Sequence, residues 1–193
     1  MRLFVALAPP ADVLDNLDAA CAPFRAARAD LRWTSREAWH VTLAFLAEVS
    51  DPQLTRLIPR LERAARRHAA FRLSFAGAGA FPSAGRANVL WSGLAGDRRA
   101  LADLAASAAA AARRAGAPPP DAGRKYRPHL TLARCRAPAD VGPVVTALWG
   151  YQGKPWTAEE ILLIRSRLRE RPRYETLGAW KLRPSTGASP DPS

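Results

Sequence analysis

Cysteine, lysine and long apolar runs are scarce in this chain of 193 residues, and each shortage excludes a class of protein. The two cysteines, Cys21 and Cys135, are too few for a disulfide framework, and neither has a zinc-ligand or protease signature around it. No apolar stretch approaches transmembrane length. The run at residues 3–8 is too short for a signal peptide, and two prolines follow it at once. We therefore expect a cytoplasmic protein with no membrane partner.

Positive charge is abundant, although lysine supplies little of it. The formal net charge is +12, and only three of the 29 basic residues are lysines. Such an excess favours polyanionic partners such as RNA, because each phosphate contact releases counterions. An arginine- and alanine-rich chain is equally typical of a biased genome, so the charge alone decides little. A glycine-rich phosphate loop is absent from the sequence.

Strands and helices alternate along the chain in an order that predicts an α+β fold with antiparallel or mixed sheets. We expect a single bilobal domain over residues 1–183 and a disordered tail over 184–193, which is rich in Ser, Gly and Pro. A loop is predicted at 116–128. Strands are predicted at 2–8, 31–34, 40–47, 71–75, 89–91, 129–134, 161–168 and 174–182, and helices at 10–29, from 51 to about 68, at 97–116 and at 138–149.

One short motif occurs twice. Residues 40–44 read HVTLA and residues 129–133 read HLTLA, so both copies are His-aliphatic-Thr-Leu-Ala on separate predicted strands. Side chains at i and i+2 of a strand point to the same face. His40 and Thr42 therefore share a face, and so do His129 and Thr131. Continued alternation would place the following alanine on that face as well and leave the aliphatic residues for the core.

Two such pairs suit the hydrolysis of a phosphodiester. The reaction needs a base that takes a proton from water and an acid that protonates the leaving oxygen, and histidine does either near neutral pH. An in-line displacement places the attacking and leaving oxygens on opposite sides of phosphorus, which calls for one histidine on each side. The threonine hydroxyls would donate hydrogen bonds to the non-bridging oxygens.

Other readings of the histidines are weaker. A single His-x-Thr on a strand is common and is more often structural than catalytic, but two copies with the same flanking Leu-Ala are much less expected by chance. His40 and His129 could also ligate zinc, although neither motif has a carboxylate or cysteine at ligand spacing. His68, the third histidine, ends a charged helix and is read as solvated surface.

The sequence resembles the two-histidine (2H) phosphoesterases, and among them the RNA 2′,3′-cyclic phosphodiesterases historically named 2′-5′ RNA ligases. The resemblance covers nearly the whole chain up to about residue 182. The matching segments are 2–7 RLFVAL, 32–33 RW, 40–46 HVTLAFL, 79–82 GAFP, 89–91 VLW, 126–134 YRPHLTLAR, 164–168 IRSRL and 174–177 YETL.

The resemblance implies a bilobal α+β fold with two pseudo-symmetric sheets flanking a central cleft, and a metal-independent hydrolysis that needs no cofactor. His40 matches the proton donor to the leaving 3′ oxygen and His129 the proton acceptor that activates water. Thr42 and Thr131 match the phosphate-binding threonines. Tyr126 matches an aromatic residue that stacks on a base. An equally good interpretation is that Tyr126 is a packed residue near the mouth of the loop.

Some positions remain open at this point. By strand parity Arg134 lies opposite His129, which would make it a supporting residue unless a bulge intervenes. Trp39 and Ala47 depart from the residues usual in the family, and neither belongs to the catalytic set. The roles of Arg165 and Arg167 are not assigned.

The expected partner is RNA with a 2′,3′-cyclic phosphate end, tRNA fragments being one candidate, and no obligate protein partner is evident. Weak reversible 2′-5′ ligation would be the same chemistry run backwards. Hydrolysis of a small cyclic nucleotide is an alternative substrate. A non-enzymatic alternative is a protein that binds RNA ends without catalysis. The presence of both histidines and both threonines argues against it.

Overall fold

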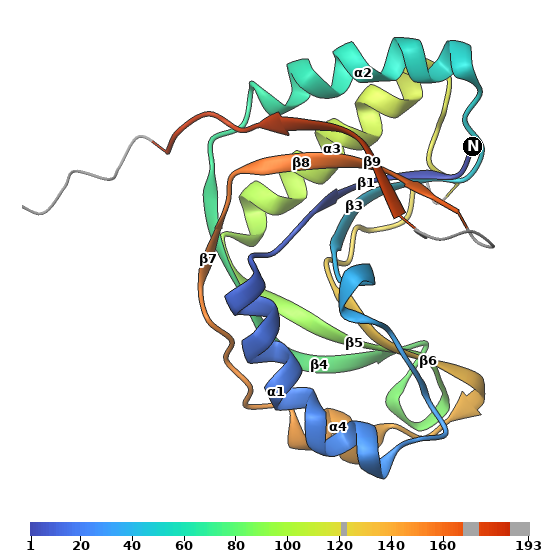
Figure 1. Cartoon of the computed structure of the whole chain (residues 1–193), viewed down its shortest axis with the longest axis vertical. Coiled ribbons are helices and arrows are strands. Elements are labelled where there is room, and N and C mark those ends of the chain that lie inside the picture. The colour runs from blue at the N-terminus through green and yellow to red at the C-terminus, as the bar shows by residue number, and fades with distance from the viewer. Residues whose placement is uncertain (121–122, 168–173, 186–193) are drawn as a thin grey trace, which may run out of the picture.

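The computed structural model describes residues 1–120, 123–167 and 174–185, and within them it contains two antiparallel sheets (Figure 1). Sheet 1 has the strand order β3-β1-β8-β9 and sheet 2 the order β2-β6-β5-β4-β7. The strands are β1 (Leu3–Leu7), β2 (Arg32–Trp33), β3 (Val41–Leu46), β4 (Phe71–Phe81), β5 (Ala87–Gly96), β6 (Leu130–Ala139), β7 (Trp156–Ala158), β8 (Glu160–Ser166) and β9 (Tyr174–Lys181).

The helices divide between two lobes. Helices α2 (Asp51–Ala65) and α3 (Arg98–Ala115) pack on each other and cover sheet 1, forming the upper lobe of Figure 1. Helices α1 (Ala11–Ala27) and α4 (Gly142–Ala147) lie beside sheet 2 in the lower lobe. Two single-turn 3₁₀ helices, η1 (Arg36–Ala38) and η2 (Ala84–Arg86), complete the described elements.

The predicted fold class is confirmed: the molecule is α+β with two antiparallel sheets and helices on the outside. Several predicted boundaries are wrong: the strands predicted at 71–75 and 89–91 extend over Phe71–Phe81 and Ala87–Gly96, and the helix predicted to about residue 68 ends at Ala65. The helix expected from residue 138 begins only at Gly142, because β6 continues through Pro138 to Ala139. Pro138 lies where the register between β6 and β5 is irregular, and a strand tolerates proline at such a place. The predicted tail falls mostly on residues outside those that the structure describes.

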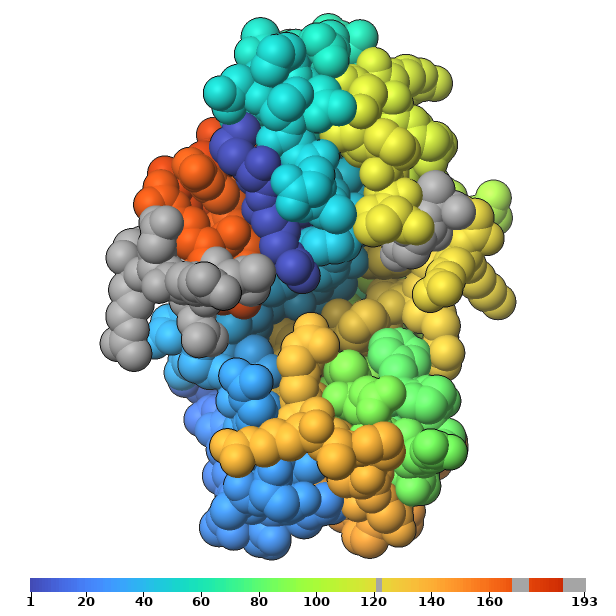
Figure 2. All heavy atoms as spheres, turned by 90° about the vertical axis from the view of Figure 1, so that its right-hand side faces the viewer, coloured from blue at the N-terminus to red at the C-terminus, as the bar shows by residue number. Residues whose placement is uncertain are grey.

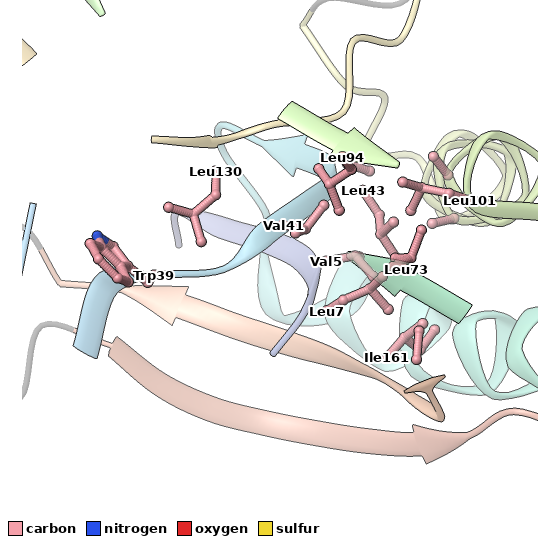
Figure 3. Packing of buried hydrophobic residues seen from close by; sticks show 14 of the residues in the cluster. Val5, Leu7, Trp39, Val41, Leu43, Leu73, Leu94, Leu101, Leu130 and Ile161 are labelled. Carbon is pink, nitrogen blue, oxygen red and sulfur yellow. The ribbon is translucent and has the colours of Figure 1, made fainter. Parts of the chain in front are cut away.

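Buried apolar side chains from both sheets form one continuous cluster. Val5 and Val41 of sheet 1, Leu73 and Leu130 of sheet 2, and Leu101 of α3 all belong to it (Figure 3). The chain order explains this continuity, because the chain passes from one sheet to the other several times. The two lobes therefore share their core rather than meeting at a polar interface.

The ends of α3 are fixed by local chemistry, and this places the loop that follows it. The Asp97 side chain accepts a hydrogen bond from the backbone N–H of Ala100 at 2.9 Å, capping the helix N-terminus. Gly116 ends the helix at φ +84, a left-handed conformation that a side chain would disfavour. The chain then turns toward the start of β6. Within the described residues, no helix has the length and apolar character needed to cross a membrane.

Candidate active site

Each motif histidine stands immediately before a strand, and each motif threonine is the second residue of that strand. His40 precedes β3 in sheet 1, and His129 precedes β6 in sheet 2. Thr42 pairs with Ala6 of β1, whereas Thr131 pairs with Trp91 of β5. All four motif side chains are half-buried, so the two motifs occupy corresponding positions in the two lobes.

Both motifs contain a β-bulge at the same place. On β3 the register passes from Thr42 opposite Ala6 to Ala44 opposite Val5, which leaves Leu43 without a partner position. On β6 the register passes from Thr131 opposite Trp91 to Ala133 opposite Leu90, which leaves Leu132 as the extra residue. The repeat in the sequence is therefore a repeat in backbone geometry.

The bulges correct the face assignment made by simple alternation. Ala44 and Ala133, expected beside the histidines, are buried in the main core with exposures of 6% and 0%. One position further, Phe45 turns to the His40 face, where it lies opposite Phe4 in a separate small cluster. Arg134 likewise lies close enough to His129 for its charge to lower the pKa of that imidazole. An extra residue inverts the side-chain alternation beyond it, so Arg134 belongs to the site.

A backbone carbonyl holds the His129 ring. Its Nδ1 lies 2.7 Å from the carbonyl oxygen of Arg127, and since a carbonyl only accepts, Nδ1 carries the proton. The Nε2 atom is then the nitrogen left for a substrate. Phe81 meets the ring edge-on with centroids 5.0 Å apart, and Trp91 lies at 6.2 Å. The guanidinium of Arg127 in turn sits 4.7 Å from the Phe81 ring centroid.

The His40 ring has an equivalent setting built from different residues. It stacks on Phe4 with centroids 4.4 Å apart, and Tyr174 of β9 meets it edge-on at 5.9 Å. The backbone of Ala38, which precedes His40 by the same interval as Arg127 precedes His129, acts on the ring and raises its pKa. Both imidazoles therefore pack against aromatic rings, and the main chain holds the ring of His129.

Burial lowers the pKa of both imidazoles. For His40 it lowers the pKa to about 4, with the backbone of Ala38 acting in the opposite sense and the charge of His129 lowering it further. For His129 burial again lowers the pKa most, the bond to Arg127 raises it, and the charges of Arg134 and Arg127 lower it. The charge of His129 thus acts on the pKa of His40, as expected for two groups that titrate together.

A pocket of about 460 Å³ opens beside the motifs, lined by Thr42, Phe45, Phe81, Tyr126 and His129 together with residues of α3 and of the loop before β6. His40 and Thr131 are not among the residues that line it. Figure 2 shows this side of the molecule, where the surface is hollowed between the two lobes and the yellow atoms of the loop stand at its edge. The structure thus brings three of the predicted site residues into one cavity.

Tyr126 has a structural bond that the sequence did not reveal. Its hydroxyl donates to the backbone carbonyl of Thr42 at 2.9 Å, and burial raises the pKa of the phenol. The bond ties the segment before β6 to β3, which connects one motif with the other. Tyr126 is half-buried against the main core and also lines the pocket, so it combines packing with a place at the cavity wall.

The aromatic walls of the site were missed by the sequence reasoning. Phe4, Phe81, Trp91 and Tyr174 all fall in segments quoted for the family resemblance, yet none was given a role. Their signal was weak because aromatic residues in strands usually indicate core packing. Their contacts with the two imidazoles depend on strand pairing between residues that are distant in sequence.

The remaining candidates lie elsewhere. His68 is half-buried and its Nε2 lies 2.8 Å from Ser107 Oγ of α3, so its prediction as solvated surface is wrong. Burial raises the pKa of both cysteine thiols, Cys21 to about 11, which makes them poor nucleophiles. In the described part of the chain, no three His, Cys, Asp or Glu side chains gather as a metal site would require.

A pseudo-symmetric α+β fold with one His-x-Thr strand in each lobe defines the class of two-histidine phosphoesterases. The family model described as LigT like Phosphoesterase matches residues 7–91 and 94–174 of the chain. A protein of Thermus thermophilus named RNA 2′,3′-cyclic phosphodiesterase is 32% identical, over 97% of this chain and 93% of its own length. One of Aeropyrum pernix with the same name is 30% identical, over 73% and 80%. The chain belongs to the LigT-like phosphoesterases of the 2H superfamily.

Solved structures agree in fold. The crystal structure of TT0787 of Thermus thermophilus superposes with a TM-score of 0.79 at 29% identity, covering 96% of this chain and 100% of that one. Escherichia coli LigT complexed with 3′-AMP gives 0.73 at 28% identity, covering 94% and 97%. Both likenesses span the two lobes and therefore both motifs.

Proposed function

We propose that this protein hydrolyses 2′,3′-cyclic phosphate ends of RNA to 2′-phosphate ends. The observation that carries the proposal is the pair of His-x-Thr strands, one from each lobe, which bring His129 and Thr42 to a single pocket. The names of the Thermus and Aeropyrum relatives supply the substrate class. The net charge of +12 suits a polyanionic substrate.

The proposed reaction divides two proton transfers between the histidines. His129 takes a proton from water as the water oxygen attacks phosphorus, and the bond from phosphorus to the 3′ oxygen breaks. His40 gives its proton to the departing 3′ oxygen, which leaves a ribose 3′-hydroxyl and a 2′-phosphate. The pair of histidines loses one proton, from His40, and gains one from water, at His129. It therefore holds one proton after the step as before it, and exchange with solvent returns that proton to His40.

The threonines are proposed to bind the non-bridging phosphate oxygens. Thr42 and Thr131 follow their histidines by two strand positions, so each hydroxyl points to the same side as its imidazole. Negative charge gathers on those oxygens in the transition state, and hydroxyl donors fixed in advance stabilise it without reorganisation. The Arg134 guanidinium beside His129 adds positive charge on the same side.

Whether the pair of histidines carries its one proton at neutral pH depends on bound substrate. Burial alone leaves both imidazoles largely neutral at pH 7, because it lowers both pKa values. A bound phosphate anion favours the charged imidazolium and raises the pKa of the ring beside it. Substrate binding therefore protonates the acid, and His40, which stacks on Phe4, is the ring to which we assign this role.

The direct test is incubation of an oligoribonucleotide that ends in a 2′,3′-cyclic phosphate, followed by identification of the product. We expect a 2′-phosphate end and undiminished rate in a metal chelator. A 3′-phosphate product, or full loss of rate on chelation with recovery on adding metal, would contradict the proposed mechanism. His68→Ala is the matched control, since it removes a histidine whose partner is Ser107.

The roles of the two histidines can be separated by the leaving group. Replacing either by alanine should slow turnover by about 10²–10⁴, and the double variant should lose less than the product of both losses. A substrate with a much better leaving group at the 3′ position should partly rescue His40→Ala and not His129→Ala. Equal rescue of both variants would mean that the roles are shared, and rescue of His129→Ala alone would mean that they are reversed.

A further inference from the structure

The pocket beside the histidines continues well past them along α3. Its far wall is made of small side chains at helical spacing, namely Ala102, Ala106 and Ala109, with Ala105 between them. Residues three and four apart lie on one face of a helix, so alanine at these positions leaves open a space that larger residues would fill. Ala102 and Ala106 are exposed, so this wall is not part of the core. The catalytic phosphate alone would not need this extension.

Cationic side chains line the same part of the pocket. Arg113 comes from the last turn of α3, and Arg124 and Lys125 come from the loop before β6. All three are exposed, and no hydrogen bond or ion pair of their side chains is found within the residues that the structure describes, whereas Arg28 for example is paired with Asp30. No carboxylate is found among the described residues that line the pocket. Three exposed cations over an apolar wall form a site for an anionic group attached to a flat or apolar one.

We infer that this extension is the subsite for the RNA strand that leads to the cyclic phosphate, with a backbone phosphate of that strand bound by Arg113, Arg124 and Lys125. The inference rests on the proposed function, because Thr42 and His129 mark the end of the pocket where the cyclic phosphate would lie. A cyclic mononucleotide has no phosphate beyond the reacting one, whereas a strand has one at every linkage. The three cations are therefore of use only to the polymer.

The size of the cavity agrees with this occupant. About 460 Å³ is in the range of concave sites that take small ligands, so the cavity admits part of a single strand and not a duplex. Tyr126 and Phe81 also line the pocket and offer aromatic surface to a base. The subsite thus selects a single-stranded end.

The experiment compares kcat/KM for a 2′,3′-cyclic mononucleotide and for a short oligoribonucleotide with the same cyclic end. We expect the wild-type protein to prefer the oligonucleotide, with a preference that falls as salt is added. The triple variant R113Q/R124Q/K125Q should lose most of that preference and flatten the salt slope by about 0.7 for each phosphate contact removed. Its rate on the mononucleotide should stay close to that of wild type.

A matched triple variant, R63Q/R67Q/R72Q, removes the same charge from exposed arginines that do not line the pocket. It should keep the oligonucleotide preference, which separates a local contact from general attraction by a basic protein. Ala106→Trp places bulk on the exposed wall without entering the core, and it should reduce the rate on the oligonucleotide and not on the mononucleotide.

The possible outcomes distinguish failure of the strand subsite from failure of the proposed hydrolysis. If neither substrate is hydrolysed, the proposed function fails and the subsite fails with it. If both are hydrolysed with equal kcat/KM, or if R113Q/R124Q/K125Q slows both alike, the function stands and the strand subsite is overturned. Equal loss on both substrates in Ala106→Trp would mean that the terminal nucleoside itself occupies the pocket, which also overturns it.

Discussion

His40 and His129 sit in environments that oppose their own protonation, and this should be visible in the pH dependence of the reaction. Burial lowers both pKa values below the ordinary 6.5, that of His40 to about 4. The pH profile of kcat/KM reports the ionisations of the free protein. We expect a bell-shaped profile whose two apparent pKa values both lie below the ordinary histidine value, with its maximum below pH 6.5. The rate falls on the alkaline side as the pair loses its one proton.

The kcat profile should lie at higher pH, because bound phosphate raises the pKa of the acid. Initial rates at low and at saturating substrate measure the two profiles. Arg134→Gln removes a charge that lowers the pKa of His129 and should move a limb of the kcat/KM bell to higher pH. A maximum of kcat/KM above pH 7 in the wild-type protein would be inconsistent with buried imidazoles.

The same burial makes His40 a source of acid sensitivity. Its pKa is lower in the folded than in the unfolded protein, so below pH 6.5 the unfolded chain binds more protons and stability falls as pH falls toward 4. Between pH 7 and pH 5 this residue alone should cost about 2 kcal/mol. Urea unfolding of wild type and His40→Asn at both pH values measures it. The variant should lose less stability than wild type between the two pH values, and equal losses would refute the assignment.

The elements around the site owe their positions to close contacts between strands. Gly79 of β4 lies opposite Trp91 of β5, and a Cβ built at Gly79 would come within 2.3 Å of the Trp91 ring. That ring lies 6.2 Å from His129, centroid to centroid, so anything that displaces it disturbs the imidazole. The glycine is thus required by the site as well as by the strand pair.

Gly79→Ala should therefore lower both stability, by about 1–3 kcal/mol, and kcat. Gly178→Ala is the matched control, since its Cβ would meet the Trp180 ring at 2.5 Å in β9. That variant should lose comparable stability while turnover at saturating substrate stays near wild type. Thermal unfolding and steady-state rates on the two variants give the comparison, and an equal loss of kcat in both would show that Trp91 does not position His129.

Strand alternation predicted part of this site and failed at a definite residue. It placed each histidine on the face of its threonine, and this prediction does not depend on the bulge, because those residues precede it. It misplaced Ala44, Ala133 and Arg134, because the extra residue at Leu43 or Leu132 has no signature in a run of leucine and alanine. The bulge is decided by pairing with β1 and β5, which are distant in sequence, so the local pattern does not contain it.

At the scale of the whole molecule, the two lobes share one core, and this determines how the protein should unfold. Leu104 of α3 has no exposed surface and belongs to the cluster that also contains Leu90 of β5 and Leu163 of β8. The chain enters and leaves each sheet more than once, so neither lobe is a continuous piece of sequence. We therefore expect one cooperative unfolding transition, as in a single domain.

Leu104→Ala tests this expectation, because it removes a core side chain from the helix that covers sheet 1. A buried leucine truncated to alanine typically costs about 2–5 kcal/mol. If the lobes unfold together, that loss must appear equally in sheet 2, although α3 belongs to the upper lobe. Native-state hydrogen exchange resolved by peptide measures the free energy of opening for β5 and β8 separately. Equal acceleration in the slowest-exchanging amides of both strands is the expected result. Acceleration confined to β8 would mean that the lobes unfold independently, and that the cleft between them lies between two stability units rather than within one.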